Sequence, residues 1–368
     1  MQLVEQRIIK IGHPAWEQID EMSFAAKNLW NAAQYSIRQS FIYGHGVPSY
    51  NQMDKLMQPT EQYKSLPAKV AQQVLKLLDK SWKSYNEAIT VFRLEPSKFT
   101  GLPKIPGYKK KDGRALLVFT EQSTSKKVFK KTGQIKLTDI DYKFDTQIQD
   151  IEQSKYCQSR IVPKLDHYVL EIVYEVPDVE LNQSERIAAI DMGIDNLMAV
   201  TSNVPGFQPV LINGKPLKSI NQFFNKKRAQ LQSRSGMLTS KRLRAFTTDR
   251  NLKVKNYLHR ASTHVIDLLV AKEITKLVIG HNPDWKRNCN IGRANNQAFI
   301  QVPHTQLIDM LTYKGARVGI EVIEREESYT SRASFLDDDF IPTYGSKPSD
   351  WKPSGKRIPK RFVQIQIW

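Results

Sequence analysis

Cysteine is scarce in this sequence. Cys157 and Cys289 are the only two, and neither lies in a CxxC pair or in a cluster with histidine. Structural zinc sites and disulfide frameworks are built from such clusters. The sequence therefore gives no case for a metal site of that kind, and both cysteines are expected to be reduced thiols.

Long apolar runs are also missing. The N-terminal stretch MQLVEQRIIK lacks the apolar centre of a signal peptide, and no window approaches the ~20 apolar residues of a membrane span. These features predict a soluble, cytoplasmic protein that has no membrane partner.

Negative charge is in deficit. The 368 residues include 55 Lys+Arg and 37 Asp+Glu, which gives a net charge of +18. The excess is spread along the whole chain, as suits a protein that lies along a polyanion and releases its condensed counterions. Ribosomal and membrane-surface proteins share such a balance, so charge favours nucleic acid as the partner without choosing a protein class.

Three stretches of different character predict a multidomain α+β fold. A strand over residues 2–11 precedes a long helical pattern, roughly 15–93. Prolines then exclude a long helix, and short alternating runs at 116–119, 134–137 and 167–176 predict strands. The region from Arg186 onward predicts an α/β arrangement with strands at 187–195, 197–201, 276–280 and 318–323, and helices at 219–234, 239–273 and 306–314.

Asp191 stands out in the apolar run IAAIDMGIDN. An acid near the end of a buried strand is a recurrent way to present a carboxylate at the edge of a sheet, although a helix cap or a solvent-facing turn is an equal alternative. Metal-dependent phosphodiester cleavage needs several carboxylates around two ions. Asp191 alone cannot supply such a centre.

Several motifs occur in an order that resembles the TnpB family, the transposon-encoded relatives of type V CRISPR effectors. IAAIDMGIDNLMAVTSN resembles the first RuvC motif, LVIGHNPDWKRN takes the place of the second, and SYTSRASFLDDD is similar to a later segment. LPAKVAQQVLKLLDKSW and PKIPGYKKK have family counterparts as well. The resemblance covers almost the whole chain.

The resemblance implies three domains. They are a wedge-like small β-barrel over residues 1–12 and 96–182, a helical recognition domain over 13–95, and an incomplete RNase H-like (RuvC) α/β domain over 183–368. It also implies a monomeric ribonucleoprotein that holds a guide RNA and binds double-stranded DNA beside a short duplex motif.

The catalytic motifs depart from the family pattern. The second motif has Gly280 where most members carry glutamate, and Glu327 is the candidate replacement. The third motif, which supplies the last aspartate, is not found before Trp368. Asp191 and Glu327 are therefore expected to be vestigial, with no resident metal and no cofactor needed for binding.

The resemblance also assigns binding residues. Lys69 and Gln73 match positions that contact the duplex motif, and Thr120 and Gln122 fall where further DNA contacts are expected; ordinary exposed polar residues are the alternative. Clustered cations are expected to contact phosphates of the guide RNA or heteroduplex, the alternative being a solvated basic face: Lys109, Lys110, Lys111, Lys226, Lys227, Arg228, Lys241, Arg242 and Arg244.

These features together predict RNA-guided DNA binding without cleavage, with transcriptional repression by promoter occlusion in a bacterial cytoplasm. An active endonuclease is the alternative, with magnesium bound by Asp191, Glu327 and a third acid among Asp337, Asp338 and Asp339. A decaying transposon fragment without function is a third reading.

Overall fold

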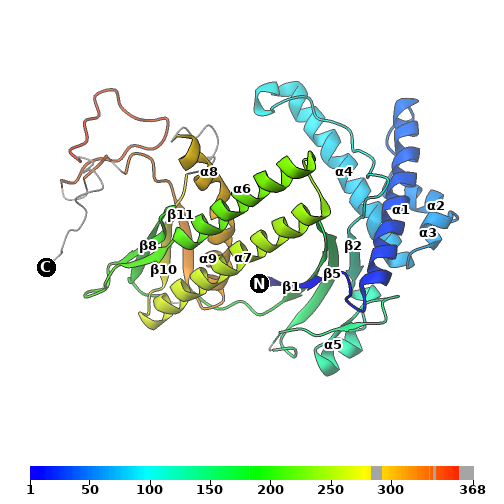
Figure 1. The fold of residues 1–368 in the computed structure, drawn as a ribbon, viewed down its shortest axis with the longest axis horizontal. Coiled ribbons are helices and arrows are strands. Elements are labelled where there is room, and N and C mark those ends of the chain that lie inside the picture. Colours follow the sequence, from blue (N-terminus) through cyan, green and yellow to red (C-terminus); the bar gives the residue numbers. More distant parts are fainter. Residues whose placement is uncertain (149, 182, 283–291, 331, 335–336, 356–368) are drawn as a thin grey trace. The chain divides into compact units, whose positions relative to one another are not determined.

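The computed structural model describes residues 1–148, 150–181, 183–282, 292–330, 332–334 and 337–355. They form two compact units, Met1–Pro177 and Asp178–Trp368. Helices and sheets occur in both (Figure 1), so the predicted mixed α+β class is confirmed.

The first unit contains a four-stranded antiparallel sheet in the order β1-β6-β5-β2. Its strands are β1 (Gln2–Ile9), β6 (Tyr168–Glu175), β5 (Lys155–Pro163) and β2 (Leu117–Thr120). In the described residues β1 and β2 are the two edges and do not pair, so the sheet is open and the expected closed barrel is not found. The four residues of β2 leave few backbone groups with which to close it.

Shorter elements accompany this sheet. Helix α5 (Lys126–Thr132) precedes a small antiparallel pair of strands, β3 (Ile135–Lys136) and β4 (Lys143–Phe144). The 3-10 helix η2 (Glu121–Ser123) follows β2 directly.

Helices of the first unit follow the predicted helical region. They are α1 (Trp16–Ile42), α2 (Tyr50–Met57), α3 (Glu61–Lys64) and α4 (Ala68–Leu94), and the 3-10 helix η1 (Pro96–Lys98) ends the run. Helices α1 and α4 pack together, and the indole N–H of Trp82 donates to Gln34 at 2.8 Å between them. Buried residues of both helices share one apolar core with the sheet. The division of this unit into a helical and a β domain stays a prediction.

The second unit contains a five-stranded sheet in the order β11-β10-β7-β8-β9. Strands β7 (Ile187–Met192), β10 (Lys276–Gly280) and β11 (Glu321–Arg325) run parallel, and β8 (Asn196–Ser202) and β9 (Val210–Asn213) continue antiparallel. Along β7, Ala188, Ile190 and Met192 are buried while the alternate residues are exposed. One face of the sheet therefore packs on the core and the other carries Asp191.

The helices of the second unit are α6 (Lys215–Ser235), α7 (Lys241–Ala271), α8 (Arg293–Gln301) and α9 (His304–Ala316). Helices α6 and α7 lie side by side as a long hairpin (Figure 1), and α7 also packs on α9. All three predicted helices of this region are present. Strand β11 begins later than expected because Gly319, at φ +76°, turns the chain after α9.

Within the described residues, no helix combines the length and the apolar character that crossing a bilayer requires.

Candidate functional site at the carboxyl ends of the second sheet

Asp191 and Glu327 line one cavity of about 710 Å³ in the second unit. Asp191 is the penultimate residue of β7, and Glu327 comes two residues after β11 ends. Parallel strands place their carboxyl ends at the same edge of a sheet, where α/β folds bind ligands. The two acids are far apart in sequence, and the fold brings them together at the edge of the sheet where a ligand could bind.

Gly280 explains how Glu327 reaches this place. Gly280 ends β10, between β7 and β11 in the sheet. A Cβ built on Gly280 would coincide with the carboxylate of Glu327. The side chain of Glu327 thus fills the space that a side chain at position 280 would need.

Hydrogen bonds fix the segment that carries Glu327. The Glu327 backbone N–H donates to Asn282 Oδ1 at 2.8 Å, and the His281 N–H donates to the carbonyl of Arg325 at 2.8 Å. The Thr330 hydroxyl donates to the Glu327 carbonyl at 2.9 Å. These bonds leave the Glu327 carboxylate directed at the cavity that it shares with Asp191.

Burial disfavours the charged form of both acids, and repulsion from Asp191 adds to this effect at Glu327. Burial raises the pKa of Asp191. Burial, and then the negative charge of Asp191, raise the pKa of Glu327, while His281 acts in the opposite sense. Two such carboxylates are suited to sharing a proton or a cation.

The acids proposed as a third ligand lie elsewhere. The Ser354 hydroxyl donates to Asp337 Oδ2 at 2.8 Å and to Asp339 Oδ2 at 3.0 Å, and the Ser334 N–H donates to Asp339 Oδ2 at 2.7 Å. Asp338 has a left-handed backbone, at φ +49°. None of the three lines the cavity of Asp191 and Glu327.

The donor set fits one divalent cation better than a pair of ions. In the part of the chain that the structure describes, no group of three or more His, Cys, Asp or Glu could hold a metal. Asp191 and Glu327 could each offer an oxygen to a single hard cation, with the remaining positions left to water or substrate. The acids present do not reproduce the clamp of a two-metal centre.

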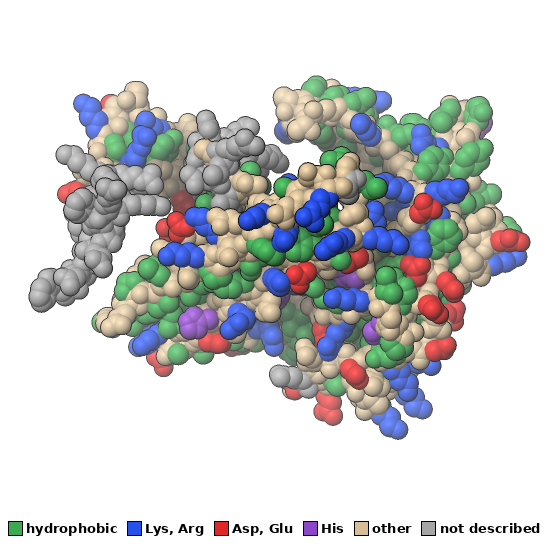
Figure 2. Space-filling view, viewed as in Figure 1, with side chains coloured by type: hydrophobic (Ala, Val, Ile, Leu, Met, Phe, Trp, Pro, Cys, Tyr) green, Lys and Arg blue, Asp and Glu red, His purple; other side chains and the backbone are tan. Residues whose placement is uncertain are grey.

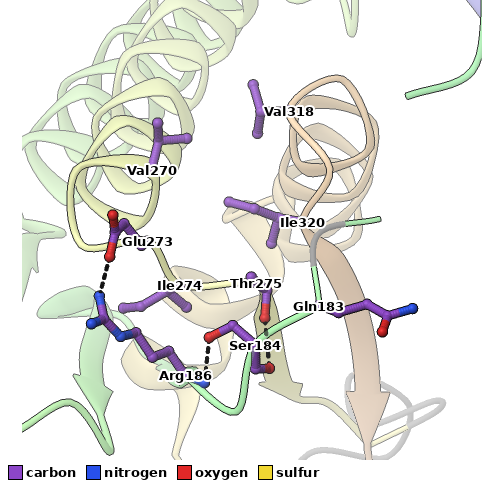
Figure 3. Close-up of a pocket in the computed structure, with 9 residues that line it drawn as sticks. All are labelled: Gln183, Ser184, Arg186, Val270, Glu273, Ile274, Thr275, Val318 and Ile320. Carbon is purple, nitrogen blue, oxygen red and sulfur yellow. Dashed lines mark hydrogen bonds and ion pairs between the residues drawn. The ribbon is translucent and has the colours of Figure 1, made fainter. Parts of the chain in front are cut away.

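A second cavity, of about 490 Å³, lies at the opposite ends of the same strands. Arg186, just before β7, forms a 2.5 Å ion pair with Glu273 and donates to the Lys272 carbonyl at 3.1 Å. The Thr275 hydroxyl donates to the Ser184 carbonyl at 2.9 Å. Figure 3 shows the Arg186–Glu273 ion pair and the Thr275–Ser184 hydrogen bond among the residues that line the cavity, with Val270, Val318 and Ile320 near its other side. These contacts fasten the end of α7 to the start of the sheet, so we assign this cavity a structural role.

The four predicted DNA-contacting residues lie on elements that touch in the first unit. Lys69 and Gln73 are one turn apart near the start of α4, Lys69 exposed and Gln73 partly exposed. The buried side of the helix carries Val70 and Val74. Helix α4 packs against β2, which ends at Thr120, and against η2, which contains Gln122.

The predicted cations Lys109, Lys110 and Lys111 lie in a segment that is hydrogen-bonded to α1. Asn31 donates to the Lys109 carbonyl at 3.0 Å and accepts from the Lys109 N–H at 2.8 Å, and Lys27 Nζ donates to the Lys111 carbonyl at 2.8 Å. The ammonium of Lys109 lies 4.2 Å from the centre of the Trp30 ring, and burial lowers its pKa. Lys110 and Lys111 are exposed, so these two are better placed than Lys109 to meet a phosphate.

The six predicted cations of the second unit lie on the α6–α7 hairpin. All are exposed, and within the described residues none forms an ion pair: Lys226, Lys227, Arg228, Lys241, Arg242 and Arg244. Figure 2 shows Lys and Arg side chains along this hairpin. Other cations of the unit are neutralised, as Lys253 is by Asp249 at 2.8 Å.

Sequence reasoning missed the aromatic residues that accompany these cations. Phe223 and Phe246 line a cavity between α6 and α7, together with Arg234. The sequence pattern that could have revealed this cavity is the spacing of positions 223, 227, 230 and 234. Steps of three and four residues place all four side chains on one face of a helix.

Comparisons with known proteins support the transposase resemblance over part of the chain. Residues 171–286 match the OrfB_IS605 family, described as probable transposase. This region contains Asp191, β10 and the basic hairpin. A comparison with the curated proteins returns no match.

Solved structures of low similarity were also found. The chain is 13% identical to Cas12f1 in a complex with sgRNA and target DNA, covering 90% of this chain and 87% of that one at a TM-score of 0.34. A CRISPR-Cas12f ternary complex gives 14% identity, 86% and 72% coverage and a TM-score of 0.34. Alicyclobacillus acidoterrestris C2c1 with single-guide RNA gives 8% identity, 86% and 64% coverage and a TM-score of 0.41.

Proposed function

We propose that this chain is a TnpB-type RNA-guided DNA-binding protein that holds its target without cutting it, and that it represses transcription by occluding a promoter. The observation that carries the proposal is the exposed basic hairpin α6–α7, whose six unpaired cations lie within the region that matches a transposase family. Such a surface fits a nucleic-acid backbone, since each phosphate that it neutralises releases counterions.

Binding without cutting is supported by the carboxylate site. Asp191 and Glu327 are the described acids of the cavity, and Asp337 and Asp339 are engaged with Ser354. Hydrolysis of a phosphodiester requires charge and geometry that several ligands supply together, and catalysis falls steeply when one is missing. We therefore expect no useful cleavage and no cofactor requirement for binding.

Purification with co-expressed RNA tests this proposal. The variable end of the co-purifying RNA, read by sequencing, names a target, and a DNA duplex that carries this target is compared with a scrambled duplex in magnesium buffer. We expect target-dependent retention with both strands intact, and loss of retention when the RNA is removed. Equal retention of the two duplexes, or none, would contradict the proposal.

Promoter occlusion is tested in cells. A reporter whose promoter contains the target should be repressed by the chain with its RNA, and the same reporter with a scrambled target should not. Unchanged reporter expression, despite retention of the target duplex in vitro, would separate DNA binding from repression.

An RNA-guided endonuclease is the second candidate, and one observation favours it. Glu327 meets Asp191 in the space that Gly280 leaves open, as a functional acid pair requires. Target cleavage in magnesium that disappears in Asp191→Ala and in Glu327→Gln would establish this activity. A cut that persists in both variants would point to a contaminating nuclease.

A further inference from the structure

A small cavity between α6 and α7 combines aromatic and basic side chains. Its volume is about 250 Å³, below the roughly 300–1,000 Å³ of pockets that take drug-sized ligands. Helix α6 contributes Phe223, Lys227, Gln230 and Arg234, and α7 contributes Arg242 and Phe246. The cavity belongs to the second unit and shares no lining residue with that of Asp191 and Glu327.

The aromatic wall is held firmly. Phe246 stacks on buried Phe224 with ring centres 5.5 Å apart and planes 18° apart, and Phe223 makes an edge-to-face contact with Phe246 at 5.8 Å between ring centres. The guanidinium of Arg250 lies 5.7 Å from the Phe224 ring and bonds Asn221 of α6. Phe223 is nevertheless 55% exposed. A ring that packs against Phe246 and is still half-exposed offers an apolar surface to a planar group.

The rest of the wall is positive. Lys227, Arg234 and Arg242 line the cavity without an acid among its lining residues, and none of the three forms an ion pair in the described part of the chain. A ligand with a planar apolar part and a negative group beside it would satisfy both walls. A nucleotide has this composition.

We propose that this cavity holds one unpaired nucleotide of the bound RNA, with its base against Phe223 and its phosphate among Lys227, Arg234 and Arg242. The inference rests on the proposed function in taking RNA as the ligand. A paired base keeps neighbours on both faces, whereas loops and bulges of RNA present splayed bases that stack on aromatic side chains. The Gln230 amide can bond the base edge or the 2′-hydroxyl, which distinguishes RNA from DNA.

Binding measurements on the full chain test the inference. The probes are a short single-stranded oligoadenylate RNA, the matching oligodeoxyadenylate and an RNA duplex of the same length, each followed by fluorescence anisotropy. We expect Phe223→Ala to weaken binding of the single-stranded RNA about 5- to 100-fold, the range of one lost base–aromatic stack. Phe223→Tyr should bind like the wild type, and the duplex affinity should not change.

Two further variants keep the result interpretable. Leu211→Ala removes a side chain on β9 that is 61% exposed, and should leave all three affinities unchanged. Lys227→Gln should lower the single-strand affinity and reduce its salt dependence by about one unit of slope. Lys227→Gln remains a test if Phe223→Ala unfolds, which thermal denaturation would show.

The outcomes separate this inference from the proposed function. Wild-type RNA binding that Phe223→Ala leaves unchanged would overturn the cavity assignment alone. Equal weakening of the duplex would make the site a backbone groove, and a greater loss for the DNA oligomer would assign it to a DNA strand; both overturn the inference. A wild-type chain that binds no RNA would overturn both proposals.

Discussion

At the scale of single residues, position 280 and Glu327 compete for one volume. The Glu327 carboxylate occupies the place of a Cβ on Gly280, and it is the flexible end of a side chain that would have to yield. Overpacking costs about 1–3 kcal/mol in a rigid site and less where the displaced group can move into solvent. The carboxylate site therefore depends on a glycine as much as on its acids.

A double-mutant cycle measures this dependence. Gly280→Ala should lower the free energy of unfolding by about 1 kcal/mol, because Glu327 must leave its place. In the Glu327→Ala background the same change should be neutral or stabilising, which gives a coupling of at least ~0.5 kcal/mol. Urea denaturation of the four proteins checks it, with Gly101→Ala as control, since a Cβ there meets nothing within 4 Å. Strict additivity would contradict the shared volume.

The raised pKa of Glu327 has a consequence for stability. Because its folded pKa lies above the ordinary carboxyl value, the folded state binds more protons than the unfolded chain between the two values. The free energy of unfolding therefore falls as pH rises through that window. Glu327→Gln should be more stable than the wild type above the window and equal to it below about pH 4.3.

Unfolding in metal-free buffer at a series of pH values checks this prediction. The difference should be small because the group is partly exposed and screened by solvent. Glu185→Gln, at an exposed position of the same unit, serves as the control. The prediction is contradicted if the free energy of unfolding of the wild type rises with pH relative to that of Glu327→Gln. That result would mean that the folded state lowers the pKa of Glu327 instead of raising it.

Residue-level prediction succeeded where a chemical pattern was local. Asp191 followed from an apolar run with an acid near its end, and the structure places it near the end of β7. The pairing with Glu327 could only be named through the resemblance, because it depends on strand order and on empty space at Gly280. Phe223 and Phe246 were missed because each looks like an ordinary core residue until the hairpin brings them together.

At the scale of elements, strand β5 shows why alternation can fail as a signal. Tyr156 is buried, and after a bulge between Tyr156 and Gln158 the buried positions become Ser159 and Ile161. The extra residue shifts the inward face by one position, so no run of strict alternation remains in the sequence. Strand β5 was not predicted, and neither were β4, β9, α5 and α8.

The contact between α1 and residues 106–111 is a further element-level feature. Asn31→Ala would remove both hydrogen bonds to Lys109, of 3.0 and 2.8 Å. We expect a loss of about 1–3 kcal/mol in the free energy of unfolding, because two backbone groups lose their partners. Faster tryptic cleavage after Lys109, Lys110 or Lys111 should accompany it.

Asn51→Ala provides the matched control, since Asn51 is exposed on α2. Its unfolding and digestion should match those of the wild type. Unchanged digestion of Asn31→Ala would show that the other bonds, from Trp30, Lys27 and Gln34, hold the segment without Asn31.

At the scale of the whole molecule, the net charge is +18. The cations that make it up differ in whether an acid of the same chain already pairs with them. Some cations are neutralised within the fold, as in Arg114–Asp20 at 2.6 Å and Lys253–Asp249 at 2.8 Å. The six predicted cations of the α6–α7 hairpin, by contrast, are exposed and form no ion pair in the described part of the chain. The net charge of the sequence predicted a polyanionic partner. Only the fold distinguishes the cations that are free to contact such a partner from those that are already paired.

Salt dependence of RNA binding measures which cations are used. Lys241→Ala should weaken binding at every RNA sequence tested and lower the slope of log affinity against log salt by about one. Lys253→Ala, on the same helix, should change the slope less because Lys253 is already paired. Equal slopes for both variants would mean that the RNA does not distinguish free from paired cations.

The shared volume at Gly280 also bears on ancestry. Because the Glu327 carboxylate fills the space of a Cβ on Gly280, any side chain at position 280 must displace that carboxylate. Searches for relatives should therefore treat positions 280 and 327 together, because a search pattern that demands an acid at the end of β10 would miss a sequence in which an acid reaches the same space from position 327.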